Sequence, residues 1–168
     1  MSAKIGINGF GRIGRDYLRY VLGSTETDLE VVAINDVTDS ATLARLLKFD
    51  SRFGPLRRDV EDLGDAIAVD GHKIAVSSER DPAQLPWREH GVQIVIESTG
   101  RFRTREAAGA HLTAGASKVL LSSPGKRGRR HHRARCQRRD VRLGPSPGDL
   151  QRLVHHELCR ADGEGAAR

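Results

Sequence analysis

Apolar residues occur along the chain in short runs separated by turn-forming residues and by stretches of helical spacing. Runs of this length that are bounded by glycine or polar residues favour buried strands. We expect core strands around Ile5 and Ile7, over 29–34, over 92–97 and over 119–121. Helical spacing predicts helices over 13–22, 41–49 and 105–114, the last ending at Gly115. Alternating strands and helices predict an α/β fold, a Rossmann-like doubly wound parallel sheet with right-handed crossovers.

The segment between the second and third of these strands has a different pattern. Residues 50–80 are rich in turns, and two short apolar pieces at 66–69 and 73–76 flank an Asp-Gly pair. This arrangement is typical of a β-hairpin. One or two helical turns are expected over 84–90.

A glycine-rich turn follows the first predicted strand, with the spacing Gly9-x-Gly11-x-x-Gly14. In a dinucleotide-binding turn, the first glycine allows the tight turn and the second lets the backbone approach a pyrophosphate. The third lets the new helix pack on the strand, and the helix N-terminus faces the anion. Asp36 ends the second strand, 22 residues beyond Gly14, where such folds place a carboxylate for the ribose hydroxyls.

Taken alone, this glycine spacing also fits a surface turn, and Asp36 alone also fits a strand-end turn. The order of strand, glycine turn, helix, strand and acid favours the dinucleotide site. Every predicted core strand ends in small or polar residues, and the carboxyl ends of parallel strands meet at one edge of a sheet. We therefore expect the turn at 9–14, Asp36, Thr99, Gly100 and Ser122 to line one crevice.

The charge of the chain is unevenly distributed. Residues 127–168 hold 11 of the 28 basic residues and 5 of the 22 acidic residues, so they carry the whole formal net charge of +6. The sequence thus divides into a domain at 1–126 and an arginine-rich tail at 127–168. Because the tail has little apolar content, we expect it to be irregular and poorly ordered.

The remaining composition excludes several classes of protein. Both cysteines, Cys136 and Cys159, lie in the tail without metal-ligand or disulfide spacing. The chain has neither a membrane-spanning apolar run nor the layout of a signal peptide, so we expect a soluble cytoplasmic protein with no membrane partner.

Six segments occur in the order and spacing of one family: INGFGRIGR, VVAINDVTD, LLKFDS, SERDP, IESTGRF and HLTAGASKVLLSSPGK. Over residues 3–126 the chain resembles the N-terminal half of phosphorylating glyceraldehyde-3-phosphate dehydrogenase. The resemblance implies an NAD-binding domain of a glycolytic oxidoreductase family whose members are cytoplasmic homotetramers. The erythrose-4-phosphate dehydrogenases are the second choice, since they tend to carry other residues at NDVTD and ESTG.

The resemblance also implies roles for single residues toward NAD. The backbone N–H groups of Arg12 and Ile13 would bind the pyrophosphate. Asp36 would bind the adenosine ribose and repel a 2′-phosphate, while Arg80 would lie beside the adenine. Thr99, Gly100 and Ser122 would lie along the nicotinamide side. Taken singly, Arg12 also fits a solvated cation at the start of a helix, Arg80 a surface ion pair, and Ser122 a strand-end cap.

The tail does not continue this resemblance. The family pattern would lead to Ser-Asn-Ala-Ser-Cys-Thr-Thr-Asn-Cys, whose first cysteine is the nucleophile, and to a catalytic domain with its histidine base. Neither is present, so we expect no catalytic residue, no catalytic domain and no dehydrogenase activity from the chain as printed. Because that domain is missing, the homotetramer is a property of the family that the resemblance does not extend to this chain.

The genetic code offers an explanation for the tail. With plausible codons, residues 155–162 read one base further on spell Thr-Thr-Asn-Cys-Val-Ala-Pro, and 150–155 permit Ser-Asn-Ala-Ser-Cys. We hypothesise a one-base shift of the reading frame near 126–128. Under this hypothesis His155, His156 and Cys159 form no catalytic pair, and the arginines reflect a GC-rich gene. A function of another class, nucleic-acid binding through the tail, ranks low for the same reason.

Overall fold

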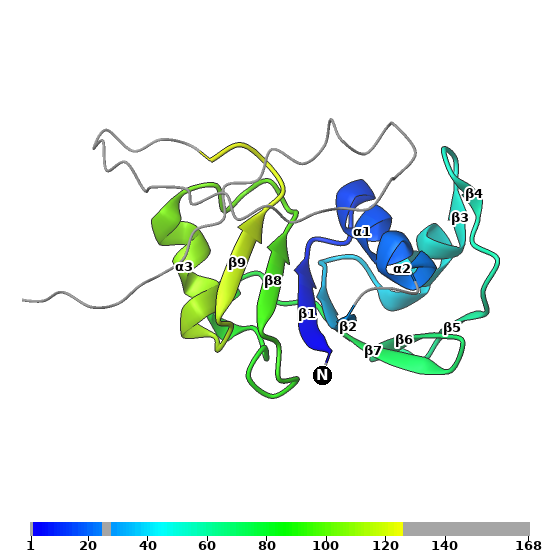
Figure 1. Cartoon of the computed structure of the whole chain (residues 1–168), viewed down its shortest axis with the longest axis horizontal. Coiled ribbons are helices and arrows are strands. Elements are labelled where there is room, and N and C mark those ends of the chain that lie inside the picture. Colours follow the sequence, from blue (N-terminus) through cyan, green and yellow to red (C-terminus); the bar gives the residue numbers. More distant parts are fainter. Residues whose placement is uncertain (1, 25–27, 126–168) are drawn as a thin grey trace, which may run out of the picture.

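The chain forms a seven-stranded sheet with helices on both faces, as seen in the computed structural model, which describes residues 2–24 and 28–125 (Figure 1). The sheet order is β5-β6-β7-β2-β1-β8-β9. Its strands are β1 (Ala3–Asn8), β2 (Leu29–Asn35), β5 (Val60–Asp62), β6 (Ala66–Val69), β7 (His72–Ser77), β8 (Ile94–Glu97) and β9 (Lys118–Leu121). The helices are α1 (Arg12–Gly23), α2 (Ser40–Lys48), α3 (Arg105–Thr113) and the 3-10 turn η1 (Pro82–Gln84). The expectations for the tail at 127–168 lie outside the described residues.

Five neighbouring strands, β7, β2, β1, β8 and β9, run parallel, which confirms the predicted α/β fold. β1 is central and pairs with β2 on one side and β8 on the other, so the order of strands reverses at β1. In an open α/β sheet, such a reversal opens a crevice at the carboxyl ends of the two strands. The fold thus places a crevice at the ends of β1 and β8.

Side chains alternate between the two faces of the sheet and build two cores. On one face, Ile5 and Ile7 of β1 pack with α1 and α2, represented by Leu18 and Leu43. On the other face, α3 and the fully buried Trp87 cover the sheet. Because both faces are covered, the central strands read as nearly continuous apolar runs, as the sequence showed.

Local signals set the ends of the helices. The carboxylate of Asp39 accepts the Thr42 N–H at 2.8 Å and caps α2, and this hydrogen bond lowers the pKa of Asp39. Thr104 caps α3 by accepting the Ala107 N–H at 3.2 Å. Gly115 follows α3 with φ +114°, which confirms the predicted C-cap.

The prediction of one or two helical turns over 84–90 holds in part: the His90 N–H donates to the Pro86 carbonyl at 3.2 Å, which closes one such turn. A further helical turn, η1, lies earlier at Pro82–Gln84, and Leu85 between them is extended with φ −68° and ψ 137°. Pro86 explains the difference, because proline disfavours helical backbone in the residue before it. The next residue, Trp87, is fully buried under the sheet.

The hairpin of β6 and β7 is confirmed, and its strands pair antiparallel. The sequence did not predict the edge strand β5 or the two-residue strands β3 (Phe49–Asp50) and β4 (Gly54–Pro55). The sheet is therefore mostly parallel, with an antiparallel margin. None of the helices described in residues 2–24 and 28–125 is long and apolar enough to cross a membrane.

Candidate functional site

The glycine turn connects the end of β1 to α1 in a backbone conformation that needs glycine. Gly9 has φ +91°, and its N–H donates to the Asn35 carbonyl at 2.8 Å. A Cβ on Gly9 would lie 2.7 Å from the backbone nitrogen of Thr99. The turn is thus pressed directly against the segment that follows β8.

The other two glycines have opposite surroundings. A Cβ on Gly14 would lie 2.4 Å from the Gly9 carbonyl oxygen, so only glycine lets α1 approach the turn this closely. A Cβ on Gly11 would meet no atom of the described residues within 4 Å. Among these residues, nothing fills the space in front of Gly11 that a ligand approaching the backbone requires.

The N-terminus of α1 is suited to an anion. Its first N–H groups have no partner within the helix, and the capping residue Gly11 has no side chain to supply one. The first turn of α1 contains no acidic residue. Arg12 and Ile13 are exposed there, so their backbone N–H groups lie at the positive end of the helix dipole.

Asp36 lies at the end of β2 and is bound to the glycine turn. Its Oδ2 accepts the Phe10 N–H at 2.7 Å, and its Oδ1 accepts the Thr38 N–H at 3.0 Å. Both oxygens are thereby oriented, and each retains acceptor capacity because a carboxylate accepts about four hydrogen bonds. Such an oriented acceptor fits a pair of ribose hydroxyls.

The third predicted part of the site follows β8 and β9. Thr99 and Gly100, the latter with φ +70°, form the turn after β8. The Ser98 hydroxyl donates to the Gly9 carbonyl at 2.6 Å and thereby ties this turn to the glycine turn. Ser122 lies beside it, because its N–H donates to the Glu97 carbonyl at 2.9 Å. The structure thus brings Thr99, Gly100 and Ser122 together, as predicted.

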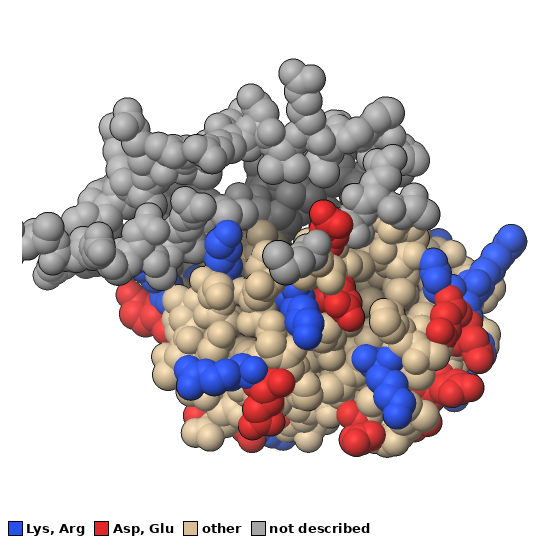
Figure 2. Space-filling view, turned by 60° about the horizontal axis from the view of Figure 1, so that its bottom comes forward, with Lys and Arg blue, Asp and Glu red and all other residues tan. Residues whose placement is uncertain are grey.

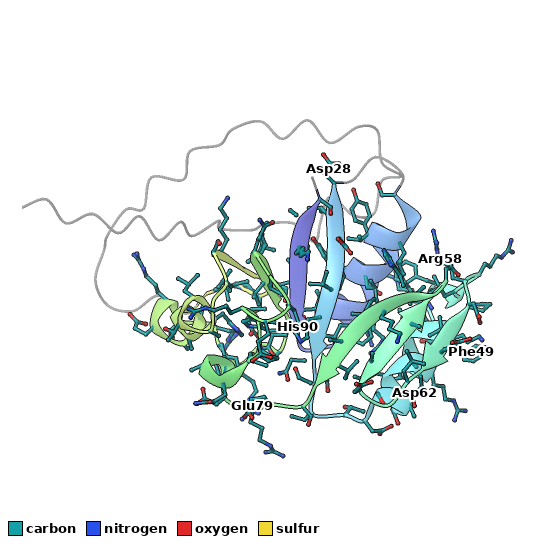
Figure 3. All side chains as sticks on the ribbon, turned by 90° about the horizontal axis from the view of Figure 1, so that it is seen from below. Asp28, Phe49, Arg58, Asp62, Glu79 and His90 are labelled. Atoms are coloured by element: carbon teal, nitrogen blue, oxygen red, sulfur yellow. The ribbon has the colours of Figure 1, made fainter. Side chains whose placement is uncertain are left out.

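Arg80 lies in the loop after β7, at the same edge of the sheet. Figure 3 shows Glu79, its neighbour, and Asp28, which precedes β2, at opposite ends of the sheet. The Glu79 carboxylate accepts the Arg80 N–H at 2.7 Å. Arg80 is exposed, and its guanidinium forms no ion pair with another residue of 2–24 or 28–125.

Sequence reasoning missed a buried polar row beneath this crevice. Ser77, Asn35, Asn8 and Glu97 occupy paired positions on β7, β2, β1 and β8. The Asn35 amide donates to Asn8 Oδ1 at 2.8 Å, and the Asn8 amide donates to Glu97 Oε2 at 2.6 Å. Each of these polar residues ends an apolar strand, a signal that could have revealed the row. His111, which also contacts Glu97, lies inside α3 and gave no such signal.

The face of the domain in Figure 2 lacks the one-sided positive charge that binds a polyanion such as nucleic acid. Figure 2 shows basic and acidic side chains interspersed across the face in view. Across the described part of the chain, no group of three or more His, Cys, Asp or Glu residues could hold a metal ion. A cavity of about 540 Å³ lies at the other end of the sheet, where Leu22, Leu29 and His72 are among its lining residues. The candidate site at the carboxyl ends of the strands rests instead on the geometry of the glycine turn and of Asp36.

Comparisons with known proteins agree with this geometry. Residues 3–105 match the family model described as glyceraldehyde 3-phosphate dehydrogenase, NAD binding domain. The chain is similar to the glyceraldehyde-3-phosphate dehydrogenase of Kitasatospora aureofaciens, with 57% identity over 121 residues, which are 72% of this chain and 36% of the relative. With the enzyme of Geobacillus stearothermophilus, the identity is 55% over 126 residues, 75% of this chain and 37% of the relative. The chain thus spans about a third of the length of the curated relatives it matches.

Proposed function

Because the chain belongs to the glyceraldehyde-3-phosphate dehydrogenase family through its NAD-binding domain, we propose that the crevice at the carboxyl ends of β1, β2 and β8 holds NAD. The cofactor's nicotinamide accepts a hydride in the family's chemistry. The described residues serve this reaction by binding and orienting the cofactor. Both cysteines of the printed chain lie at 127–168, outside the matched residues 3–105, so the proposal does not extend to aldehyde chemistry.

One contact carries the proposal: the 2.7 Å hydrogen bond from the Phe10 N–H to Asp36 Oδ2. It joins the expected phosphate-binding turn to the expected ribose acceptor at a fixed separation. A surface glycine turn has no need of such a contact with a carboxylate 26 residues away. A Cβ on Gly11 would meet no described atom within 4 Å, which leaves room at the turn for a pyrophosphate.

Each remaining residue has a defined place in the proposal. The N–H groups of Arg12 and Ile13 bind the pyrophosphate, and the Arg80 side chain covers the adenine. Thr99, Gly100 and Ser122 bound the nicotinamide half. Since the ends of β1 and β8 are tied by Ser98, the two halves of the crevice keep one geometry.

The Asp36→Asn substitution is expected to weaken NAD binding about tenfold, equivalent to about 1.4 kcal/mol. The amide keeps one acceptor oxygen but loses the charge that strengthens hydrogen bonds from ribose hydroxyls. The affinity for NADP should stay the same or rise, because the repulsion of a 2′-phosphate is lost. Isothermal calorimetry with both cofactors measures the two effects.

Asp39→Asn is the matched control for this experiment. It removes an exposed carboxylate three residues further on, and asparagine caps helices as well as aspartate does. We expect unchanged NAD binding in this variant. An Asp36→Asn chain that binds NAD as tightly as the parent contradicts the proposed ribose contact.

We also propose the division of the chain into a cofactor domain at 1–126 and an out-of-frame tail at 127–168. The nucleotide sequence is expected to encode Ser-Asn-Ala-Ser-Cys-Thr-Thr-Asn-Cys one base out of frame with 150–159. Sequencing the gene across codons 124–168 tests this. Codons that cannot give this motif remove the hypothesis and restore nucleic-acid binding by the arginines as a candidate function.

The family also suggests a compartment and an assembly. We propose the cytoplasm, where glycolytic relatives act. We do not propose the family's homotetramer for the printed chain, because it spans only 36% of the Kitasatospora relative.

A further inference from the structure

Directly behind Thr99, the buried side chain of Glu97 determines the shape of the proposed nicotinamide side. Glu97 is 2% exposed and ends β8. Its Oε1 accepts the backbone N–H of Thr99 at 2.8 Å and also the Thr99 hydroxyl. One carboxylate oxygen therefore fixes both the backbone and the side chain of the residue that begins the turn.

The other oxygen of Glu97 faces the interior. Oε2 accepts the Asn8 amide at 2.6 Å and contacts Nε2 of His111 at 2.9 Å. His111 comes from α3 and is 0% exposed. An imidazole nitrogen can donate or accept, so the role of His111 depends on which nitrogen carries the proton.

Trp87 decides that question. Its indole Nε1–H lies 3.1 Å from His111 Nδ1. The indole can only donate, so Nδ1 accepts and the proton of the imidazole lies on Nε2. His111 is then neutral, and its Nε2–H donates to Glu97. The Asn8 amide nitrogen lies 3.4 Å from His111 Nε2. Both nitrogens are donors in this assignment, and both donate to Glu97 Oε2.

With this assignment, Glu97 accepts four hydrogen bonds: two from Thr99, one from Asn8 and one from His111. Buried carboxylate oxygens need hydrogen-bond donors that replace water, and these four donors supply them. If Nδ1 carried a proton, that N–H and the Trp87 indole N–H would face each other as two donors, and the hydrogen bond between the two rings would be lost. With the proton on Nε2, His111 therefore adds a donor to the carboxylate that holds Thr99.

We propose that Trp87 and His111 are positioning residues that act through Glu97 to hold the turn at Thr99 and Gly100 in its cofactor-binding conformation. This inference rests on the proposed NAD site. Neither residue reaches the crevice itself, since both lie under the sheet with α3. They act in a chain of hydrogen bonds from the indole to the imidazole, the carboxylate and the turn.

The test compares two ligands on the complete chain: NAD, and ADP-ribose, which lacks the nicotinamide. Trp87→Phe removes the indole donor but keeps an aromatic ring, and His111→Gln replaces the imidazole with an amide. Each variant is expected to bind NAD about fivefold more weakly, the effect of about one hydrogen bond. ADP-ribose affinity should change less than twofold, because the glycine turn and Asp36 are untouched.

Val92→Ala is the control for loss of packing. Val92 is buried in the same apolar cluster as Trp87. Its backbone N–H donates to the Trp87 carbonyl at 2.8 Å, a bond that alanine keeps, and its apolar side chain forms no hydrogen bond. This variant should unfold at a lower temperature and leave the ratio of the two affinities unchanged. Nitrogen NMR of labelled histidine should show the Nε2–H form of His111 in the parent chain and a loss of that single form in Trp87→Phe.

The outcomes separate the two proposals. A parent chain that binds neither ligand contradicts the NAD site itself. A parent that binds both, with an unchanged affinity ratio in both Trp87→Phe and His111→Gln, overturns the positioning role. A parent in which the proton of His111 lies on Nδ1 overturns it as well.

Discussion

The Gly14→Ala substitution is expected to lower the free energy of unfolding by about 3 kcal/mol, the upper end of the cost of forcing a larger side chain into a packed site. The variant is also expected to lose NAD binding. The added methyl group would lie 2.4 Å from the Gly9 carbonyl oxygen. That carbonyl cannot move freely, because it accepts the Ser98 hydroxyl at 2.6 Å. Helix α1 must therefore move away from the turn. Urea denaturation measures the loss of stability, and calorimetry measures the loss of binding.

Gly109→Ala is the matched control, since Gly109 also lies inside a helix. A Cβ on Gly109 would meet nothing within 4 Å. Alanine is the better helix former, so this variant should gain about 0.5–1 kcal/mol. Equal stability of the Gly14→Ala and Gly109→Ala chains would show that α1 does not approach the turn as described.

The Gly11→Ala substitution should separate binding from folding. Gly11 has φ −68°, which alanine adopts readily, and its surroundings are open, so stability should change by less than about 1 kcal/mol. NAD affinity should fall about a hundredfold, or about 2.7 kcal/mol. The methyl group keeps the pyrophosphate from the helix N-terminus, and hydrogen bonds to a charged group contribute about 1.5–3 kcal/mol each.

Gly23→Ala tests whether any change in α1 would have this effect. Gly23 is the last residue of the same helix, and a Cβ there would also meet nothing within 4 Å. We expect its NAD affinity to equal that of the parent, as measured by calorimetry under the same conditions. Unchanged NAD binding by the Gly11→Ala chain would contradict the approach of the cofactor to this turn.

The parallel core could be predicted, and so could the gathering of the candidate site residues at one edge of the sheet, because each depends on local sequence. An apolar run such as 29–34 predicts a buried strand wherever it lies, and a positive φ at Gly9 follows from the turn it must make. Asp36 was predicted because its distance from the glycines along the chain is characteristic. These features need no knowledge of packing.

The parts that could not be predicted depend on contacts between distant segments. β5 has only three residues and exists because it pairs with β6 at the sheet margin. His111 resembles any polar residue of a short helix, and only the packing of α3 brings its ring to Glu97 and Trp87. The sequence contains these residues but no local signal for their contacts.

The position of β1 at the centre of the sheet has a consequence for the order of events during synthesis. Asn8 of β1 is synthesised 89 residues before its partner Glu97. At about 5–20 residues per second, translation leaves one side of β1 without its neighbouring strand for several seconds. The emerging chain must keep this apolar strand from pairing with other chains during that interval. The turn at Thr99 and Gly100, which bounds the proposed nicotinamide side, follows β8 and reaches the glycine turn only when β8 has paired with β1.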